Sequence, residues 1–159
     1  MNEYITFGRN ALIKELWVQP RNHHFNKPDG GLWACKYTPD KEYISSWQEW
    51  CNEESFNTGR MDIGVVFNLT DNARVYIIDK YNDLEWLMDR YNDNESFPSM
   101  PTLDFEKISK DYDVIELTDK GQWETRLSRP LSLYGWDVEC VLILNFDVIG
   151  EQKGINISA

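Results

Sequence analysis

The amino-acid sequence predicts a single α+β domain, built from about six short strands and three short helices. Runs of β-branched and aromatic residues are interspersed with segments whose apolar residues recur at helical spacing. The run Val141–Leu144 is apolar at every position, which is typical of a strand that is buried on both faces. With 159 residues, the chain is long enough for one well-packed core. We expect residues 1–150 to form this domain and residues 151–159 to form a weakly ordered tail.

The N-terminal segment is expected to contain one strand and one helix. Tyr4–Phe7 predicts a short strand that ends at Gly8. Residues 10–18 carry apolar side chains at helical spacing, and Pro20 marks the end of the predicted helix.

The chain is organised around the stretch Lys27–Cys51. A Pro-Asp-Gly-Gly turn at 28–31 leads into an aromatic strand, Leu32–Tyr37, and then into a segment with three aromatic residues at helical spacing. Glycines let a backbone approach a ligand closely, and aromatic side chains can form a wall beside it. This stretch therefore suits a pocket for a flat ligand, and it equally suits a hairpin edge over an aromatic core.

Two strands rich in β-branched residues follow, Asp62–Leu69 and Ala73–Ile78. Residues 70–72 favour a turn, so the sequence predicts that the two strands form a β-hairpin. Asp79 then has the position of an N-cap for a helix that extends through Tyr91.

The C-terminal part is expected to hold a short helix and two strands. Residues 103–108 predict the helix, with Asp104 near its start. Asp113–Leu117 predicts a strand, and residues 119–122 predict a turn after it. The last strand is expected within Trp136–Leu144.

Composition and charge exclude several classes of function. The net charge of −11, from 27 acidic and 16 basic residues, is expected to repel nucleic acids and anionic membranes. No long apolar run or N-terminal secretion signal is visible, so we expect a cytoplasmic protein without a membrane span. The three cysteines lack metal-ligand spacing, so we expect reduced thiols and no metal site.

Glu139 is the acidic residue that the sequence singles out. It directly precedes the apolar run that begins at Val141, and Asp137 lies two residues before it. Alternation along a strand would place both carboxylates on one side of the chain, at the mouth of a buried strand. A carboxylate at such a place is costly to bury without a partner or a purpose.

Three pieces of the sequence, in chain order, resemble the ADP-ribosyltransferase family. They are a strand that ends in a small motif, a glycine-led aromatic strand, and an acidic residue that opens an apolar strand: Ile5-Thr6-Phe7-Gly8-Arg9, Gly30-Gly31-Leu32-Trp33-Ala34 and Glu139-Cys140-Val141-Leu142-Ile143. Asp137-x-Glu139 is similar to the paired acids of the family's bacterial toxin branch. The Lys-Pro-x-Gly-Gly-Leu-Trp and Leu-Tyr-Gly-Trp-Asp blocks also resemble those of small phage and prophage proteins.

The resemblance implies split antiparallel sheets and a mono-ADP-ribosyltransferase-like activity that uses NAD as substrate, in the host cytoplasm if the protein is encoded by a phage. ADP-ribose would pass to a protein or nucleic-acid acceptor, with Glu139 and Asp137 as the catalytic carboxylates. The residues implied to bind NAD come from the first two pieces and the segment that follows them: Phe7, Gly8, Arg9, Gly31, Trp33, Ala34, Tyr37 and Trp47.

Two other classes of function remain open. One is a non-catalytic member of the same fold that only binds a partner. The other is an acidic inhibitor of a nucleic-acid-binding complex, such as an anti-CRISPR-like phage anti-defence protein, whose negative charge would mimic nucleic acid.

Overall fold

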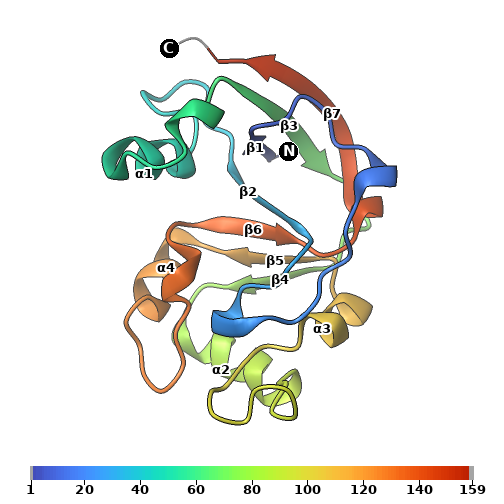
Figure 1. The fold of residues 1–159 in the computed structure, drawn as a ribbon, viewed down its shortest axis with the longest axis vertical. Coiled ribbons are helices and arrows are strands. Elements are labelled where there is room, and N and C mark those ends of the chain that lie inside the picture. The colour runs from blue at the N-terminus through green and yellow to red at the C-terminus, as the bar shows by residue number, and fades with distance from the viewer. Residues whose placement is uncertain (1, 158–159) are drawn as a thin grey trace.

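The computed structural model describes residues 2–157 and confirms a single α+β domain (Figure 1). Within these residues, seven strands form one mixed sheet in the order β4-β5-β6-β2-β1-β3-β7, one strand more than expected. The strands are β1 Glu3–Phe7, β2 Leu32–Lys36, β3 Ile63–Leu69, β4 Val75–Ile78, β5 Val114–Leu117, β6 Cys140–Ile143 and β7 Ile149–Asn156. The four α-helices are α1 Ser46–Glu54, α2 Tyr81–Arg90, α3 Phe105–Asp111 and α4 Asp119–Thr125.

The sheet opens between β1 and β2. These antiparallel strands share only two register pairs, Tyr4 with Lys36 and Ile5 with Cys35, whereas β1 and β3 share five. In Figure 1, β1, β3 and β7 accordingly form an upper part, β4, β5 and β6 form a lower part, and β2 runs between them. The strands therefore diverge toward the end of β1 and the start of β2.

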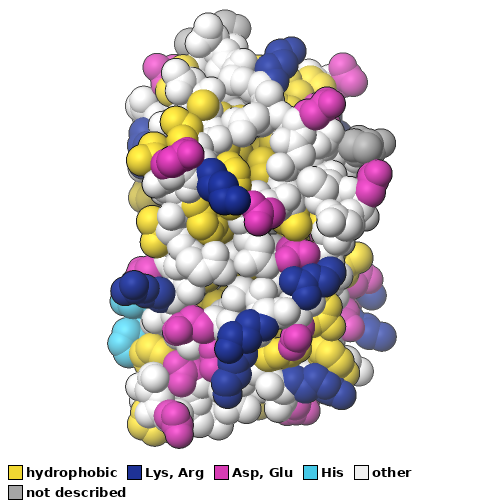
Figure 2. Space-filling model, turned by 90° about the vertical axis from the view of Figure 1, so that its right-hand side faces the viewer, with side chains coloured by type: hydrophobic (Ala, Val, Ile, Leu, Met, Phe, Trp, Pro, Cys, Tyr) yellow, Lys and Arg dark blue, Asp and Glu magenta, His cyan; other side chains and the backbone are white. Residues whose placement is uncertain are grey.

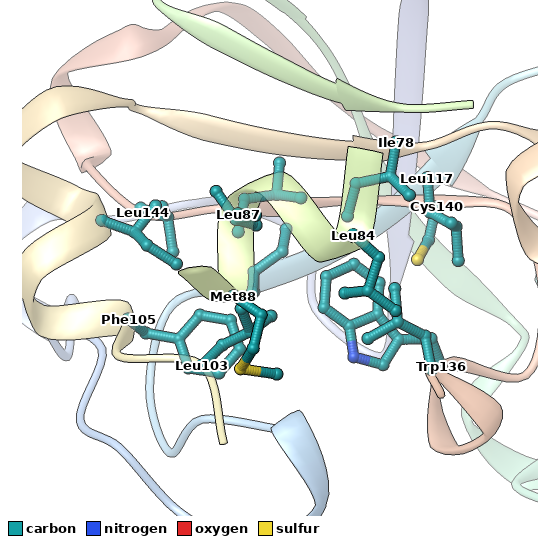
Figure 3. Close-up of a cluster of buried hydrophobic side chains, with 14 of the residues drawn as sticks. Ile78, Leu84, Leu87, Met88, Leu103, Phe105, Leu117, Trp136, Cys140 and Leu144 are labelled. Atoms are coloured by element: carbon teal, nitrogen blue, oxygen red, sulfur yellow. The ribbon is translucent and has the colours of Figure 1, made fainter. Parts of the chain in front are cut away.

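The central strand β6 is buried on both faces, as its unbroken apolar run predicts. Val141, Leu142, Ile143 and Leu144 are all at most 2% exposed. Leu142 and Leu144 belong to the core on the helix-covered face, and Val141 and Ile143 belong to the core on the other face. Figure 3 shows the first of these cores, in which Leu84 of α2 lies next to the ring of Trp136.

The predicted β-hairpin between β3 and β4 is wrong, although both strands exist. β3 pairs with β1 on one edge and β7 on the other, so neither of its edges is free for β4. β4 instead pairs with β5, in the only parallel ladder among the described strands. Arg74, just before β4, donates hydrogen bonds to both carboxylate oxygens of Asp113, just before β5, which fixes the start of this ladder.

Three local expectations also need correction. Residues 10–18 form no α-helix and contain only a 3-10 turn, Lys14–Leu16. The expected turn at 119–122 is the first part of α4, capped by Thr118, whose side chain accepts a hydrogen bond from the N–H of Gly121. α2 begins after Lys80 rather than Asp79.

The segment expected to be a weakly ordered tail belongs instead to β7. Residues 151–156 continue this strand, which is antiparallel to β3 at the edge of the sheet. The strand is polar because it lies at the edge and most of its side chains are exposed, so it lacks the apolar pattern of a buried strand. Ile157 follows the strand, and the last two residues of the expected tail, 158–159, lie outside the described residues.

The charges of the surface are mixed on the face that Figure 2 presents. Basic and acidic side chains are interspersed there, and hydrophobic side chains lie in a hollow in the upper half of the face. The net charge of −11 is therefore not gathered into one acidic surface on this side of the molecule.

Candidate functional site

A cleft of about 410 Å³ lies where β1 and β2 diverge, and we call it the β1–β2 cleft. One wall comes from the end of β1 and the connection between α1 and β3, and the other comes from β2 and the segment before β6. A volume of this size is in the range of small-molecule sites, about 300–1,000 Å³. The missing pairing between the two strands thus creates the space for a ligand.

Three tryptophans line the cleft together with other apolar side chains, among them Phe7, Phe56 and Met61. The rings of Trp33 and Trp136 meet edge to face, with centroids 4.8 Å apart and an interplanar angle of 87°. Trp136 is buried, and its indole N–H donates a 2.8 Å hydrogen bond to the carbonyl of Asn26, which fixes the ring. Trp47 lines the cleft from α1 and stacks on Trp50. The aromatic wall is therefore preorganised by its own packing.

Asp137 supplies the single carboxylate that lines this cleft among the described residues. Its backbone has φ 64° and ψ −50°, a conformation that non-glycine residues seldom adopt. Burial raises the pKa of Asp137, while the positive charges of Lys27 and Arg126 act in the opposite direction. A carboxylate that is partly removed from water interacts more strongly with a positive charge beside it.

The cleft also carries an unusual share of basic residues for so acidic a chain. Arg9, Lys27 and Arg60 all line it, and none of them forms an ion pair within residues 2–157. The whole sequence has 27 acidic against 16 basic residues. Composition alone therefore does not lead us to expect three basic side chains without ion-pair partners in one cleft. This arrangement favours a ligand with negative charge.

Glu139 lies outside the β1–β2 cleft. Its carboxylate accepts a 2.8 Å hydrogen bond from the Ser46 hydroxyl at the start of α1, and it lines a separate polar cavity with Lys36 and Glu116. Burial raises the pKa of Glu139, and the hydrogen bond from Ser46 acts in the opposite direction. The two expected catalytic carboxylates therefore do not converge on one site.

Local backbone geometry explains why the alternation argument was wrong for these two acids. β6 begins only at Cys140, and residues 138–139 form a bend rather than extended strand. The positive φ of Asp137 turns its side chain toward the cleft, and that turn breaks the period of two that would have placed Glu139 beside it.

Most of the residues expected to bind NAD lie together in the structure. Six of them line the β1–β2 cleft: Phe7, Arg9, Gly31, Trp33, Ala34 and Trp47. Gly8 and Tyr37 are not among the lining residues. The main-chain N–H of Tyr37 instead donates a hydrogen bond to Glu3, at the closed end of the β1–β2 pairing.

Sequence reasoning did not single out several other side chains of the cleft, among them Trp136, Phe56 and Arg60. Trp136 adjoins Asp137 in the Tyr-Gly-Trp-Asp block, and this proximity could have pointed to it. Phe56 and Arg60 come from the polar segment after α1, which has no pattern that singles them out.

Comparisons with known proteins do not assign this cleft. No family model, curated protein or solved structure matches the chain. In residues 2–157, no group of three or more histidine, cysteine or acidic side chains is arranged to hold a metal ion. The described part of the chain also has no helix of the length and apolarity needed to cross a membrane.

Proposed function

We propose that the β1–β2 cleft binds NAD and that the protein is an ADP-ribosyltransferase-like enzyme, which passes ADP-ribose to a protein or nucleic-acid acceptor. The observation that carries this proposal is an aromatic cleft with one partly buried carboxylate, Asp137, on its wall. Flat rings can stack against the tryptophans. The side chains of Arg9, Lys27 and Arg60, which form no ion pair within residues 2–157, suit the phosphates of a dinucleotide.

The proposed chemistry requires an ionised carboxylate, which stabilises positive charge, rather than a protonated acid that donates a proton. The bond between nicotinamide and the ribose carbon breaks, and nicotinamide leaves with the electron pair of that bond. Positive charge develops on the ribose until a nucleophile of the acceptor attacks the carbon and gives up its proton. A fixed carboxylate beside the ribose stabilises this charge, and such a preorganised group contributes about 3–4 kcal/mol.

Asp137 takes the role that the sequence suggested for Glu139. It is the carboxylate that shares a cavity with Trp33 and Trp136, whereas Glu139 is held by Ser46 in another cavity. Trp33 and Trp47 line the same cleft. In this proposal they pack against nicotinamide, and their apolar surface keeps water from the ribose carbon.

Nicotinamide release tests the proposal, with NAD as the substrate and a set of protein and nucleic-acid acceptors. Asp137→Asn keeps the size of the side chain and removes its charge, so release should fall about a hundredfold or more, with NAD affinity nearly unchanged. Glu139→Gln is the matched control and should retain the wild-type rate.

The opposite outcomes are informative. A wild-type protein that binds NAD and releases no nicotinamide with any acceptor tested would favour a non-catalytic binding protein. A loss of release in Glu139→Gln with none in Asp137→Asn would return the catalytic role to Glu139. Absence of NAD binding in calorimetry would remove the proposal altogether.

A further inference from the structure

Arg60 lies against the backbone of Gly8. A side-chain carbon at position 8 would come within 2.8 Å of both the Nε and an Nη atom of the Arg60 guanidinium. Any residue other than glycine would therefore push the guanidinium away from the end of β1. Gly8 also has φ +83°, a conformation that disfavours other residues.

The guanidinium of Arg60 lies beside the end of β1, and its charge remains available to a ligand. Arg60 ends the 3-10 turn Thr58–Arg60 in the connection between α1 and β3, and its side chain lines the β1–β2 cleft. Within residues 2–157 it has no acidic partner within ion-pair distance. Arg9, which directly follows Gly8 in the sequence, lines the same cleft and also forms no ion pair with any residue that the structure describes.

We propose that Arg60 and Arg9 form an anion subsite of the cleft that binds the diphosphate of the ligand, and that Gly8 is a positioning residue for Arg60. This inference rests on the proposed function only for the identity of the ligand. A guanidinium has several N–H donors in a planar fork, which matches phosphate oxygens and gives charge-assisted hydrogen bonds.

The arrangement gives Gly8 a role that does not require it to touch the ligand. Gly8 is not among the residues that line the cleft, yet its missing side chain leaves the space that the guanidinium occupies. A side chain at position 8 would displace the guanidinium from this space and so from the position in which it lines the cleft.

Calorimetry with two ligands separates the subsite from the rest of the cleft. ADP-ribose carries the diphosphate, and nicotinamide riboside carries the ring and ribose without phosphate. Arg60→Gln should lower the affinity for ADP-ribose about ten- to a hundredfold and weaken its dependence on salt, with no change for nicotinamide riboside. Arg129→Gln is the matched control, because Arg129 is exposed and lies outside the cleft.

A double-mutant cycle tests the role of Gly8. Gly8→Ala should lower the affinity for ADP-ribose in the wild-type background and have little further effect in the Arg60→Gln background, because the residue acts through Arg60. A purely structural effect of the alanine would lower affinity equally in both backgrounds. Melting temperatures of all four proteins show whether each variant is folded.

The outcomes distinguish this inference from the proposed function. Nicotinamide release together with unchanged ADP-ribose affinity in Arg60→Gln would overturn the subsite and leave the proposed function standing. Tight, Arg60-dependent binding of ADP-ribose without nicotinamide release would support the subsite and overturn the enzyme. Failure of the wild-type protein to bind ADP-ribose would overturn the subsite.

Discussion

The N–H of Val138 donates a 2.7 Å hydrogen bond to the carbonyl of Trp136 and closes a three-residue turn around Asp137. The positive φ and negative ψ of Asp137 are those of the rare and strained γ-turn. This turn lies between Trp136, which lines the cleft, and the strand β6, and Asp137 at its centre also lines the cleft. Backbone strain at a cleft is a feature of functional sites.

Asp137→Gly should abolish activity without lowering the stability of the protein. The strain at such a position amounts to about 1–3 kcal/mol, which offsets the roughly 0.5–1 kcal/mol of extra backbone entropy that a glycine loses on folding. We therefore expect the free energy of unfolding to stay the same or to rise, while nicotinamide release is lost. Chemical denaturation beside the release assay measures both. A clear loss of stability would show that the aspartate side chain itself holds the turn.

The buried strand β6 should dominate the response of the fold to mutation. Leu142 is fully buried between the layers, so Leu142→Ala should lower the free energy of unfolding by about 2–5 kcal/mol. Leu16→Ala is the matched control, because Leu16 is 74% exposed, and it should change stability by less than about 0.5 kcal/mol. Similar small effects of the two substitutions in urea denaturation would contradict the position of β6 in the core.

Acid should weaken the fold through Asp113. The hydrogen bonds from Arg74 lower the pKa of this carboxyl to about 2, and a further hydrogen bond comes from Asn145. A carboxyl whose pKa is lower in the folded state contributes stability above its unfolded value of about 3.9 and loses that contribution as the pH falls toward the folded value. Asp113→Asn should therefore be less stable than the wild type at pH 6, and the difference should shrink between about pH 4 and pH 2.

An exposed ion pair provides the comparison for that experiment. Lys14 and Asp147 are 2.8 Å apart, but their side chains are 64% and 78% exposed, so solvent screens their interaction. Asp147→Asn should leave the free energy of unfolding at pH 6 nearly unchanged. If both aspartate variants lost the same stability at that pH, the buried position of Asp113 would not be the cause.

Glu139 is expected to reduce stability in its charged form. Burial raises its pKa, so folding favours the protonated carboxyl, and stability is lost as the pH rises through the folded value. Glu139→Gln removes the charge and keeps a group that can accept from Ser46, so the variant should be at least as stable as the wild type at pH 8. Lower stability of the glutamine variant throughout the pH range would instead indicate that the charged hydrogen bond stabilises the fold.

The sequence predicted those features that depend on local pattern. The apolar run of β6 and the aromatic strand β2 are visible in composition and spacing, and six of the eight expected NAD-binding residues meet in one cleft because they occupy the facing ends of β1 and β2 and the start of α1. The start of a helix near Asp104 was visible for the same reason, and the structure shows that Asp104 is the N-cap of α3.

Features that depend on distant contacts were not predictable in this way. Gly121 suggested a turn, whereas it allows α4 to pack against the end of β4, where a side chain would come too close to the carbonyl of Ile78. The strands that pair with β3 are β1 and β7, which come from opposite ends of the chain. No local pattern in the sequence indicates that β3 pairs with these strands rather than with β4. The contact between Arg60 and Gly8 joins residues that are far apart in the sequence, so no local pattern indicates it.

The two register pairs between β1 and β2 are the fewest of any strand pairing among the described residues, and they join the two parts of the sheet at the closed end of the cleft. Phe7 and Arg60 belong to the part on the β1 side of this pairing, while Trp33 and Asp137 belong to the part on the β2 side. A ligand that contacts both parts would stabilise this short pairing. Amide hydrogens of the paired residues should then exchange more slowly when the cleft is filled, including those of residues that the ligand does not touch.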